Sequence, residues 1–210
     1  MIFFEPEQRD RKLLPWDPFK GVVVPRPIGW ISSMSKAGQV NLAPYSYFNG
    51  VQSHPRIVSF CSESEKDAAA FAIESGEFAW SMATWALREK MNATSEGLPR
   101  GRSEFEFAGL ATAPCRLIGA PRVADSPAAM ECRVTQVLRV KDIDGRETGG
   151  IVVYGQVVGM HLDERFISKG RFDLAAVRPI ARCGYDEYTT VEGVFAMQRP
   201  ESGGSSFGAK

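Results

Sequence analysis

The sequence predicts a mainly β fold with short helices, in which a β-barrel has the helices packed on its outside. Three observations predict this class. β-branched and apolar runs recur along the chain between Pro and Gly residues, as expected for a series of strands. Helical patterns are few and short. Strand and helix patterns also fail to alternate as βαβ units would, which disfavours a doubly wound sheet.

Composition narrows the class of protein further. A chain of 210 residues suits one domain better than two. Lys plus Arg and Asp plus Glu number 25 each, so the formal net charge is zero. Nucleic-acid-binding proteins usually carry a basic excess, so no nucleic acid partner is expected. No apolar stretch reaches the ~20 residues of a membrane span, and acidic residues follow Met1–Phe4 at once, where a secretory signal needs a longer apolar core. We therefore expect a cytoplasmic protein with no membrane partner.

The chain divides into three predicted parts. Residues 1–20 are expected to form an irregular N-terminal arm, because three prolines interrupt a charged stretch. Residues 21–198 form the predicted domain. Residues 199–210 contain a Gly/Ser-rich run and are expected to be a flexible tail.

Within the domain, the residue patterns predict elements one after another. The helix at 66–74 is rich in alanine and has an apolar face, and residues 141–146 have the composition of a hairpin turn. Residues 151–162 are apolar on both parities, so we expect that strand to be buried on both faces. In chain order we predict strands at 22–24, 28–34 and 57–61, a helix at 66–74, a strand at 77–82, a helix at 85–93, a loop at 96–106, and strands at 132–140 and 151–162.

Cysteine and histidine spacing gives no indication of a metal site. None of the cysteines forms a CxxC pair, and only two histidines are present, whereas structural zinc sites draw on closely spaced ligand pairs. We therefore expect no metal and buried free thiols in a reducing compartment. The cysteines concerned are Cys61, Cys115, Cys132 and Cys183.

Common catalytic motifs are also missing from the sequence. There is no GxGxxG opening a helix after a strand, no phosphate loop of the GxxxxGK[ST] type and no GxSxG nucleophile elbow. A site built mainly from backbone amides and hydroxyls remains, which is what a bound cofactor requires.

Two segments are more distinctive. They are VPRPIGWISSMSKAGQVNLAPYSYF at 24–48 and SFCSESEKDAAAF at 59–71. Together they resemble the flavin reductase-like family of FMN-binding split-barrel proteins, which includes flavoredoxins and the reductase partners of two-component monooxygenases. The resemblance extends over residues 15–191 and includes the RPIAR segment at 178–182. It implies a split β-barrel, a homodimer with flavin sites at the subunit interface, and FMN as cofactor.

An isoalloxazine ring is flat and largely apolar, so it needs an apolar wall and a few hydrogen-bond partners. Pro44 lacks an N–H, and we expect it to interrupt strand pairing and leave the backbone of 41–46 free. The alternative is an ordinary strand, turn and β-bulge. By the resemblance, the flavin and ribityl contacts are Ser32, Ser33, Met34, Asn41, Ala43, Pro44 and Ser46.

The FMN phosphate requires positive charge or a cluster of donors, and a helix N-terminus offers unpaired N–H groups. Lys66 matches the phosphate-contacting lysine of the family's Lys-Asp-Thr signature, but Ala68 replaces the threonine here. A capping box with Ser64 as N-cap is the structural alternative. The further cofactor contacts expected in this part are Cys61, Ser62, Ser64, Lys66 and Arg100.

Acidic residues complicate this phosphate site. Glu63 and Glu65 bring negative charge close to a dianion and weaken binding unless they point away from it. Arg100 or Arg102 is expected to compensate.

His161 is the candidate catalytic residue. It ends the strand predicted at 151–162, and the resemblance implies that a histidine near this strand end lies beside the flavin or the nicotinamide. The alternative is a purely structural hydrogen bond.

The expected function is an FMN-binding oxidoreductase that transfers a hydride from NADH or NADPH to flavin and passes electrons to a monooxygenase or another acceptor. The alternatives are an FMN electron carrier without nicotinamide turnover, a flavin-free split-barrel dimer that acts as a scaffold, and a pyridoxamine-phosphate oxidase or haem-binding relative. The sequence leaves the choice between NADH and NADPH open.

Overall fold

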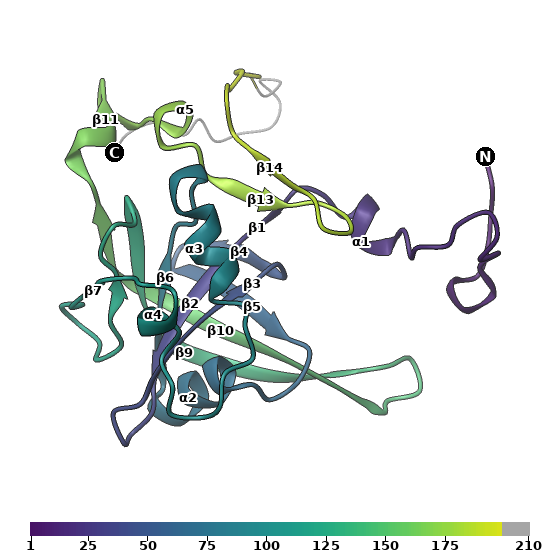
Figure 1. The fold of residues 1–210 in the computed structure, drawn as a ribbon, viewed down its shortest axis with the longest axis horizontal. Helices are drawn as coiled ribbons and strands as arrows, with labels where there is room; N and C mark the ends of the chain where they lie inside the picture. Colours follow the sequence, from purple (N-terminus) through teal and green to yellow (C-terminus); the bar gives the residue numbers. More distant parts are fainter. Residues whose placement is uncertain (199–210) are drawn as a thin grey trace.

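Antiparallel strands form most of the protein in this computed structural model, which describes residues 1–198 (Figure 1). The strands are β1 (Arg26–Pro27), β2 (Gly29–Met34), β3 (Val40–Tyr45), β4 (Phe48–Ser53), β5 (Arg56–Ser62), β6 (Glu77–Ser81), β7 (Thr112–Ala113), β8 (Arg122–Val123), β9 (Ala128–Lys141), β10 (Glu147–Leu162), β11 (Ile167–Ser168), β12 (Arg171–Phe172), β13 (Ile180–Arg182) and β14 (Tyr188–Thr190). The helices are η1 (Pro6–Gln8), α1 (Phe19–Val22), α2 (Asp67–Ser75), η2 (Trp85–Leu87), α3 (Arg88–Ala93), α4 (Glu104–Phe107), η3 (Glu164–Phe166) and α5 (Leu174–Val177).

Seven of these strands form the main sheet, in the order β3-β2-β6-β9-β10-β5-β4. Every pairing in it is antiparallel. A second sheet has the order β1-β13-β14. The mainly β architecture with short helices is therefore confirmed. Across residues 1–198, none of the helices has the length and apolar character needed to span a membrane.

Two apolar clusters lie on opposite sides of β2. Ile31 belongs to a cluster with Phe60 and Phe78, whereas the adjacent Trp30 belongs to another. Successive side chains of a strand point to opposite faces, so this alternation means that β2 is buried on both faces. The alanine-rich face of α2 packs on the first cluster, and α3 and α4 pack on the second. The predicted alanine-rich helix is confirmed, and the residues that it buries are Ala68, Ala69, Phe71 and Ala72.

Strands β9 and β10 form a long hairpin, as the sequence predicts. In its turn, Asp142 Oδ1 accepts hydrogen bonds from the backbone N–H groups of Asp144 and Arg146, each at 2.9 Å. The prediction that this second strand is buried on both faces is wrong. Burial alternates at its start, where Ile151 and Val153 are buried and Val152 and Tyr154 are partly exposed.

A glycine in β10 allows close packing inside the barrel. A Cβ atom on Gly155 would lie 2.5 Å from the Phe78 ring, which is nearer than real Cβ contacts allow. The ring can therefore lie against the β10 backbone only because residue 155 has no side chain.

Two local predictions are also wrong. Residues 22–24 do not form a strand: α1 ends at Val22, and all three valines are exposed with no strand beside them. β-branched residues favour strands mainly when a sheet surface packs against them, and here none does. The predicted loop at 96–106 contains the start of α4, which forms because Phe105 is buried in the second apolar cluster.

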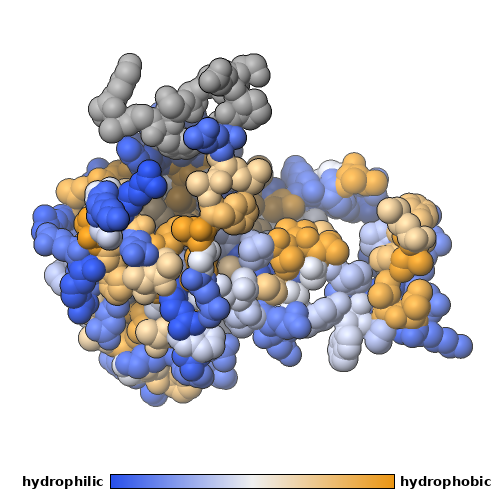
Figure 2. Space-filling view, turned by 90° about the horizontal axis from the view of Figure 1, so that it is seen from above, coloured by the Kyte–Doolittle hydropathy of each residue, from blue (hydrophilic) through white to orange (hydrophobic). Residues whose placement is uncertain are grey.

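The N-terminal segment extends away from the two sheets (Figure 1). Figure 2 shows apolar side chains gathered along this projection, among them the exposed Phe3 and Trp16. The segment joins the body through Arg26, whose guanidinium donates to the carbonyl oxygens of Lys20 and Cys183 at 2.6 and 2.8 Å. The predicted flexible tail at 199–210 lies outside the described residues.

Candidate functional site

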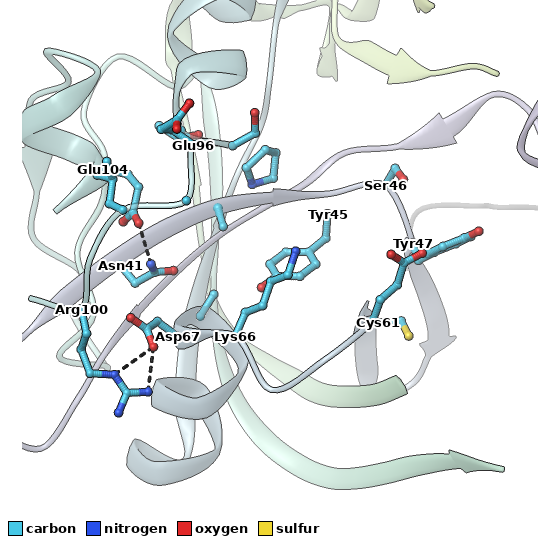
Figure 3. Close-up of a pocket in the computed structure, with 18 of the residues that line it drawn as sticks. Asn41, Tyr45, Ser46, Tyr47, Cys61, Lys66, Asp67, Glu96, Arg100 and Glu104 are labelled. Carbon is cyan, nitrogen blue, oxygen red and sulfur yellow. Dashed lines mark hydrogen bonds and ion pairs between the residues drawn. The ribbon is translucent and has the colours of Figure 1, made fainter. Parts of the chain in front are cut away.

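A cavity of about 590 Å³ lies between three segments of the chain (Figure 3). One wall is β3 and the residues that follow it, to position 47. The second is the connection from β5 into α2, between residues 61 and 68. The third runs from residue 94 to residue 104. Small-molecule and cofactor sites commonly have volumes of about 300–1,000 Å³, so the cavity is large enough for a cofactor.

Seven of the twelve predicted cofactor contacts line this cavity, and five do not. The lining residues are Asn41, Ala43, Pro44, Ser46, Cys61, Lys66 and Arg100. The others are Ser32, Ser33, Met34, Ser62 and Ser64.

Three of the serines away from the cavity use their hydroxyl groups inside the fold. Ser32 donates to the Pro121 carbonyl oxygen at 2.6 Å, and Ser33 donates to that of Ala68 at 2.9 Å. Ser62 donates to the Ser64 carbonyl oxygen at 2.6 Å. All three side chains are fully buried, so in this arrangement they support the strands and the α2 connection.

Pro44 does not interrupt strand pairing. It lies opposite Trp30 in a regular β2–β3 ladder. Because β3 is the last strand of the main sheet, its other edge has no strand beside it within the described chain. A proline is tolerated where its missing N–H would face away from the ladder, so the free backbone groups lie on the outer edge of β3.

Three cationic side chains line the cavity, and two of them are already paired. Lys20 Nζ lies 3.2 Å from Glu63 Oε1, and Arg100 Nη2 lies 2.8 Å from Asp67 Oδ1. Lys66 forms no ion pair with any residue in 1–198. In Figure 3 its side chain extends into the space beside Tyr45. Lys66 is therefore the cation available to an anionic ligand.

The acidic residues near Lys66 are directed to other partners. Glu63 pairs with Lys20, and Glu65 Oε2 lies 3.2 Å from Arg139 Nη2. Both carboxylates are largely exposed. Their charges are thus offset by neighbouring cations rather than directed at the Lys66 ammonium.

The N-terminus of α2 is open toward the cavity. Helix α2 begins at Asp67, with Lys66 as its extended N-cap, and no side chain of the described residues caps it. The capping-box alternative with Ser64 is therefore wrong, because the helix starts two residues too late for it. The N–H groups of an uncapped first turn, together with the helix dipole, favour an anion at this position.

Two buried polar atoms in the cavity wall lack hydrogen-bond partners among residues 1–198. They are Asn41 Oδ1 and the Tyr45 hydroxyl, each on a residue that is 8% exposed. Burial raises the pKa of Tyr45 to about 12, so the hydroxyl stays protonated at neutral pH. Leaving such groups unpaired costs about 1–3 kcal/mol each, which a ligand able to pair them would recover.

Glu104 is the residue of the cavity wall that sequence reasoning missed most clearly. It is 5% exposed, and burial raises its pKa although the Leu42 N–H opposes that shift. Its carboxylate binds Asn41 and Leu42 across a gap of more than sixty sequence positions. The residues 94–98 were also missed, and no local sequence motif marks either group. Tyr45 and Tyr47 could have been inferred, since both lie in the NLAPYSYF segment.

His161 lies in a different place. Its Nε2 atom is 2.6 Å from Glu131 Oε1, beside a separate cavity of about 600 Å³ that is also lined by Arg116 and Arg122. The structure therefore does not bring this candidate catalytic residue to the cavity that holds the predicted flavin contacts.

Cys115, Glu131 and His161 have potential ligand atoms within 4.8 Å of one another. Sequence spacing did not reveal this cluster, because its members come from three separate segments. Burial raises the pKa of the Cys115 thiol to about 12, and two arginines line the adjacent cavity, which disfavours a cation there. The absence of a metal remains a prediction.

Comparisons with known proteins agree on one class. The family model for the flavin reductase like domain matches residues 22–172. Uncharacterized protein BH2278 of Halalkalibacterium halodurans is 31% identical over 185 residues, covering 86% of this chain and 88% of that protein. Nitrilotriacetate monooxygenase component B from Bacillus cereus superimposes with a TM-score of 0.85 at 28% identity, covering 94% of this chain and 98% of its own.

A more distant structure shows the fold alone. A Shewanella frigidimarina protein described as a flavin reductase with a split barrel domain has a TM-score of 0.78 at 19% identity. It covers 86% of this chain and 89% of its own. The split-barrel fold predicted from the sequence is therefore confirmed.

Proposed function

Because this chain belongs to the flavin reductase-like family, we propose that it binds FMN in the cavity between β3, α2 and residues 94–104 and oxidises NADH or NADPH. When bound, the flavin supplies the two-electron chemistry, accepting a hydride from the nicotinamide and passing electrons to an acceptor. The protein needs no acid or base for that step. Its role is to hold the nicotinamide and isoalloxazine rings close together in the orientation that hydride transfer requires and to limit the access of water.

The observation that carries this proposal is an open helix N-terminus beside a lysine that forms no ion pair with any residue from 1 to 198. Lys66 and the first N–H groups of α2 would hold the FMN phosphate. Lysine is a common phosphate ligand and acts as a point charge. Ala68 supplies no hydroxyl donor, so the main chain and Lys66 take the larger share of this contact.

The remaining wall suits a flavin ring and its ribityl chain. Ala43 and Pro44 offer apolar surface, and Ser46 offers a hydrogen bond, as do the polar atoms of Asn41 and Tyr45 that have no partner among the described residues. An apolar wall with a few convergent polar groups is the usual composition of a cofactor pocket.

Two extensions concern partners. The Bacillus cereus relative is named as a monooxygenase component, which supports delivery of reduced flavin to a partner oxygenase. The exposed apolar side chains of the N-terminal segment support a homodimer, because contiguous apolar surface usually marks an interaction site. Both extend the proposal and can be tested separately from it.

The deciding experiment is a visible absorbance spectrum of the purified protein before and after incubation with FMN and desalting. Retained flavin bands, followed by their bleaching when NADH or NADPH is added without oxygen, are the expected result. Retained flavin that neither nucleotide reduces would favour an electron carrier. If no flavin is retained, NADH oxidation with excess FMN separates an enzyme that uses FMN as substrate from a flavin-free scaffold.

A further inference from the structure

Glu104 and Asn41 form a buried pair in the wall of the cavity (Figure 3). Glu104 Oε1 accepts a hydrogen bond from Asn41 Nδ2 at 2.9 Å, and Glu104 Oε2 accepts one from the Leu42 N–H at 2.9 Å. The Leu42 N–H is part of the β3 backbone and cannot turn away. Both carboxylate oxygens are therefore engaged by donors from the same edge of β3.

This pair fixes which end of the Asn41 amide faces away from Glu104. The hydrogen bond from Asn41 Nδ2 to Glu104 Oε1 turns the NH₂ group of the amide toward the Glu104 carboxyl. The amide oxygen then points the other way. That oxygen, Asn41 Oδ1, is buried and has no partner among the described residues. This oxygen can therefore accept a hydrogen bond from a donor on a bound ligand.

The oxidised isoalloxazine ring carries one hydrogen-bond donor, the N3–H. The ribityl hydroxyls both donate and accept, so they tolerate either orientation of a neighbouring amide. We propose that Glu104 is a positioning residue that holds the Asn41 amide as an acceptor for the N3–H of the bound flavin. This inference rests on the proposed function and names the contact that orients the ring.

The substitution Glu104→Gln reverses the orientation. The glutamine oxygen accepts from the fixed Leu42 N–H, so the glutamine NH₂ group faces Asn41. The Asn41 amide must then turn its oxygen to that group and its own NH₂ toward the flavin. Two donors, this NH₂ and the ring N3–H, would confront each other.

The test is a fluorescence titration with FMN and with N3-methyl FMN, which lacks the ring N–H. The matched control is Glu106→Gln, an exposed position on the same helix. In Glu104→Gln we expect FMN affinity to fall roughly tenfold or more, the range for a mispaired buried group, and N3-methyl FMN affinity to change little. The control should bind both flavins as the natural protein does.

A second variant separates orientation from folding. It is the double substitution Asn41→Asp with Glu104→Gln, in which a carboxylate replaces the amide. One oxygen of this carboxylate accepts from the glutamine NH₂, and the other faces the cavity as an acceptor. FMN affinity should therefore recover toward that of the natural protein. A merely structural role for Glu104 predicts no such recovery.

The outcomes distinguish the two proposals. If the natural protein binds FMN but Glu104→Gln weakens both flavins equally, weakens neither, or is not rescued by the double substitution, the positioning role is overturned and the FMN site stands. If the natural protein binds neither flavin, the proposed function fails and this inference fails with it.

Discussion

Arg100 directs two of its donors at one oxygen of Asp67. Its Nε and Nη2 atoms lie 3.0 and 2.8 Å from Asp67 Oδ1. Asp67 is the first residue of α2, so the arginine that was expected to compensate for nearby acids is held at the helix start by another acid. The two opposite charges largely cancel at the rim of the cavity.

Releasing Arg100 should strengthen phosphate binding. Asp67→Asn removes a negative charge beside the N-terminus of α2, and we expect FMN affinity to rise about threefold, in line with ~0.5–1 kcal/mol for such charges. Riboflavin affinity should not change. Flavin titrations at low and high salt measure both, with the exposed Asp125→Asn as control. A loss of FMN affinity would show that the pair instead holds Arg100 in a binding position.

Removing Lys66 should act in the opposite direction. Because Lys66 is the cavity cation without an ion pair in the described part of the chain, Lys66→Ala should weaken FMN binding by roughly 1.5–3 kcal/mol, the range for a hydrogen bond to a charged group. Riboflavin lacks the phosphate and should be affected far less. Lys36→Ala removes an exposed lysine outside the cavity and serves as control. An equal loss of affinity for FMN and riboflavin would show that Lys66 does not bind the phosphate.

Tyr45→Phe should separate folding from binding. The Tyr45 hydroxyl is buried without a partner among the described residues, so its removal should leave the free protein equally stable or up to about 1 kcal/mol more stable. The ring would keep its contact with Phe60, at 5.0 Å between centroids. FMN affinity should fall, because a ligand partner of the hydroxyl is lost. Thermal unfolding without flavin and flavin titration check the two effects, and a clear loss of stability would contradict the first.

The Glu131 carboxyl should make the free energy of unfolding depend on pH in the acidic range. Burial alone would raise the pKa of this carboxyl, but hydrogen bonds from the Arg116 and Leu117 N–H groups and from His161 outweigh it and lower the pKa below its ordinary 4.5. The ionised form therefore stabilises the fold above about pH 4.5. That contribution is lost as pH falls through the lowered folded-state value.

The matching experiment is urea unfolding of the natural protein and Glu131→Gln across this range. The variant leaves one backbone N–H unpaired, so it should be less stable by about 1–3 kcal/mol at pH 7. The difference should narrow as pH falls below 4.5, where the carboxyl takes up a proton in the unfolded chain more readily than in the folded protein. A difference that stays constant with pH would exclude the ionised carboxylate as its source.

His161→Asn decides between catalysis and structure. Because Nε2 is 2.6 Å from a buried carboxylate and His161 does not line the flavin cavity, we expect a lower melting temperature and nearly unchanged kcat with NADH or NADPH. A hydride-transfer role predicts the reverse, a fall in kcat of tenfold or more with little loss of stability. Steady-state kinetics on both nucleotides, paired with thermal unfolding, separates the two.

Much of the fold could be read from local patterns. The strands ending at Met34 and Ser62, the helix α2 and the β9–β10 hairpin follow from periodicity and turn chemistry. The errors share one cause: whether a short segment becomes a strand or a helix depends on the surface that packs against it, and local sequence does not show that surface. The exposed valines at 22–24 lack a packing surface, and α4 exists because Phe105 reaches a core made by distant strands.

The site was predictable in part for the same reason. Lys66 and Asn41 lie in segments with a recognisable pattern, so they could be named. Glu104 could not, since its role depends on a contact with a strand that precedes it by more than sixty positions. The family resemblance placed Ser32 and Ser33 at the ligand, yet both hydroxyls already donate to carbonyl oxygens inside the fold.

The third wall of the cavity has a useful property for protein engineering. Thr94 accepts a hydrogen bond from the Trp30 indole at 2.9 Å, and Glu104 is hydrogen-bonded to β3. Residues 95–97 and 99–100 between them are exposed and pair with no strand of residues 1–198. The length and composition of this segment can therefore be varied between the anchored residues Thr94 and Glu104 without disturbing either apolar cluster. A library confined to this segment should yield folded variants that differ in which flavins and nucleotides they accept.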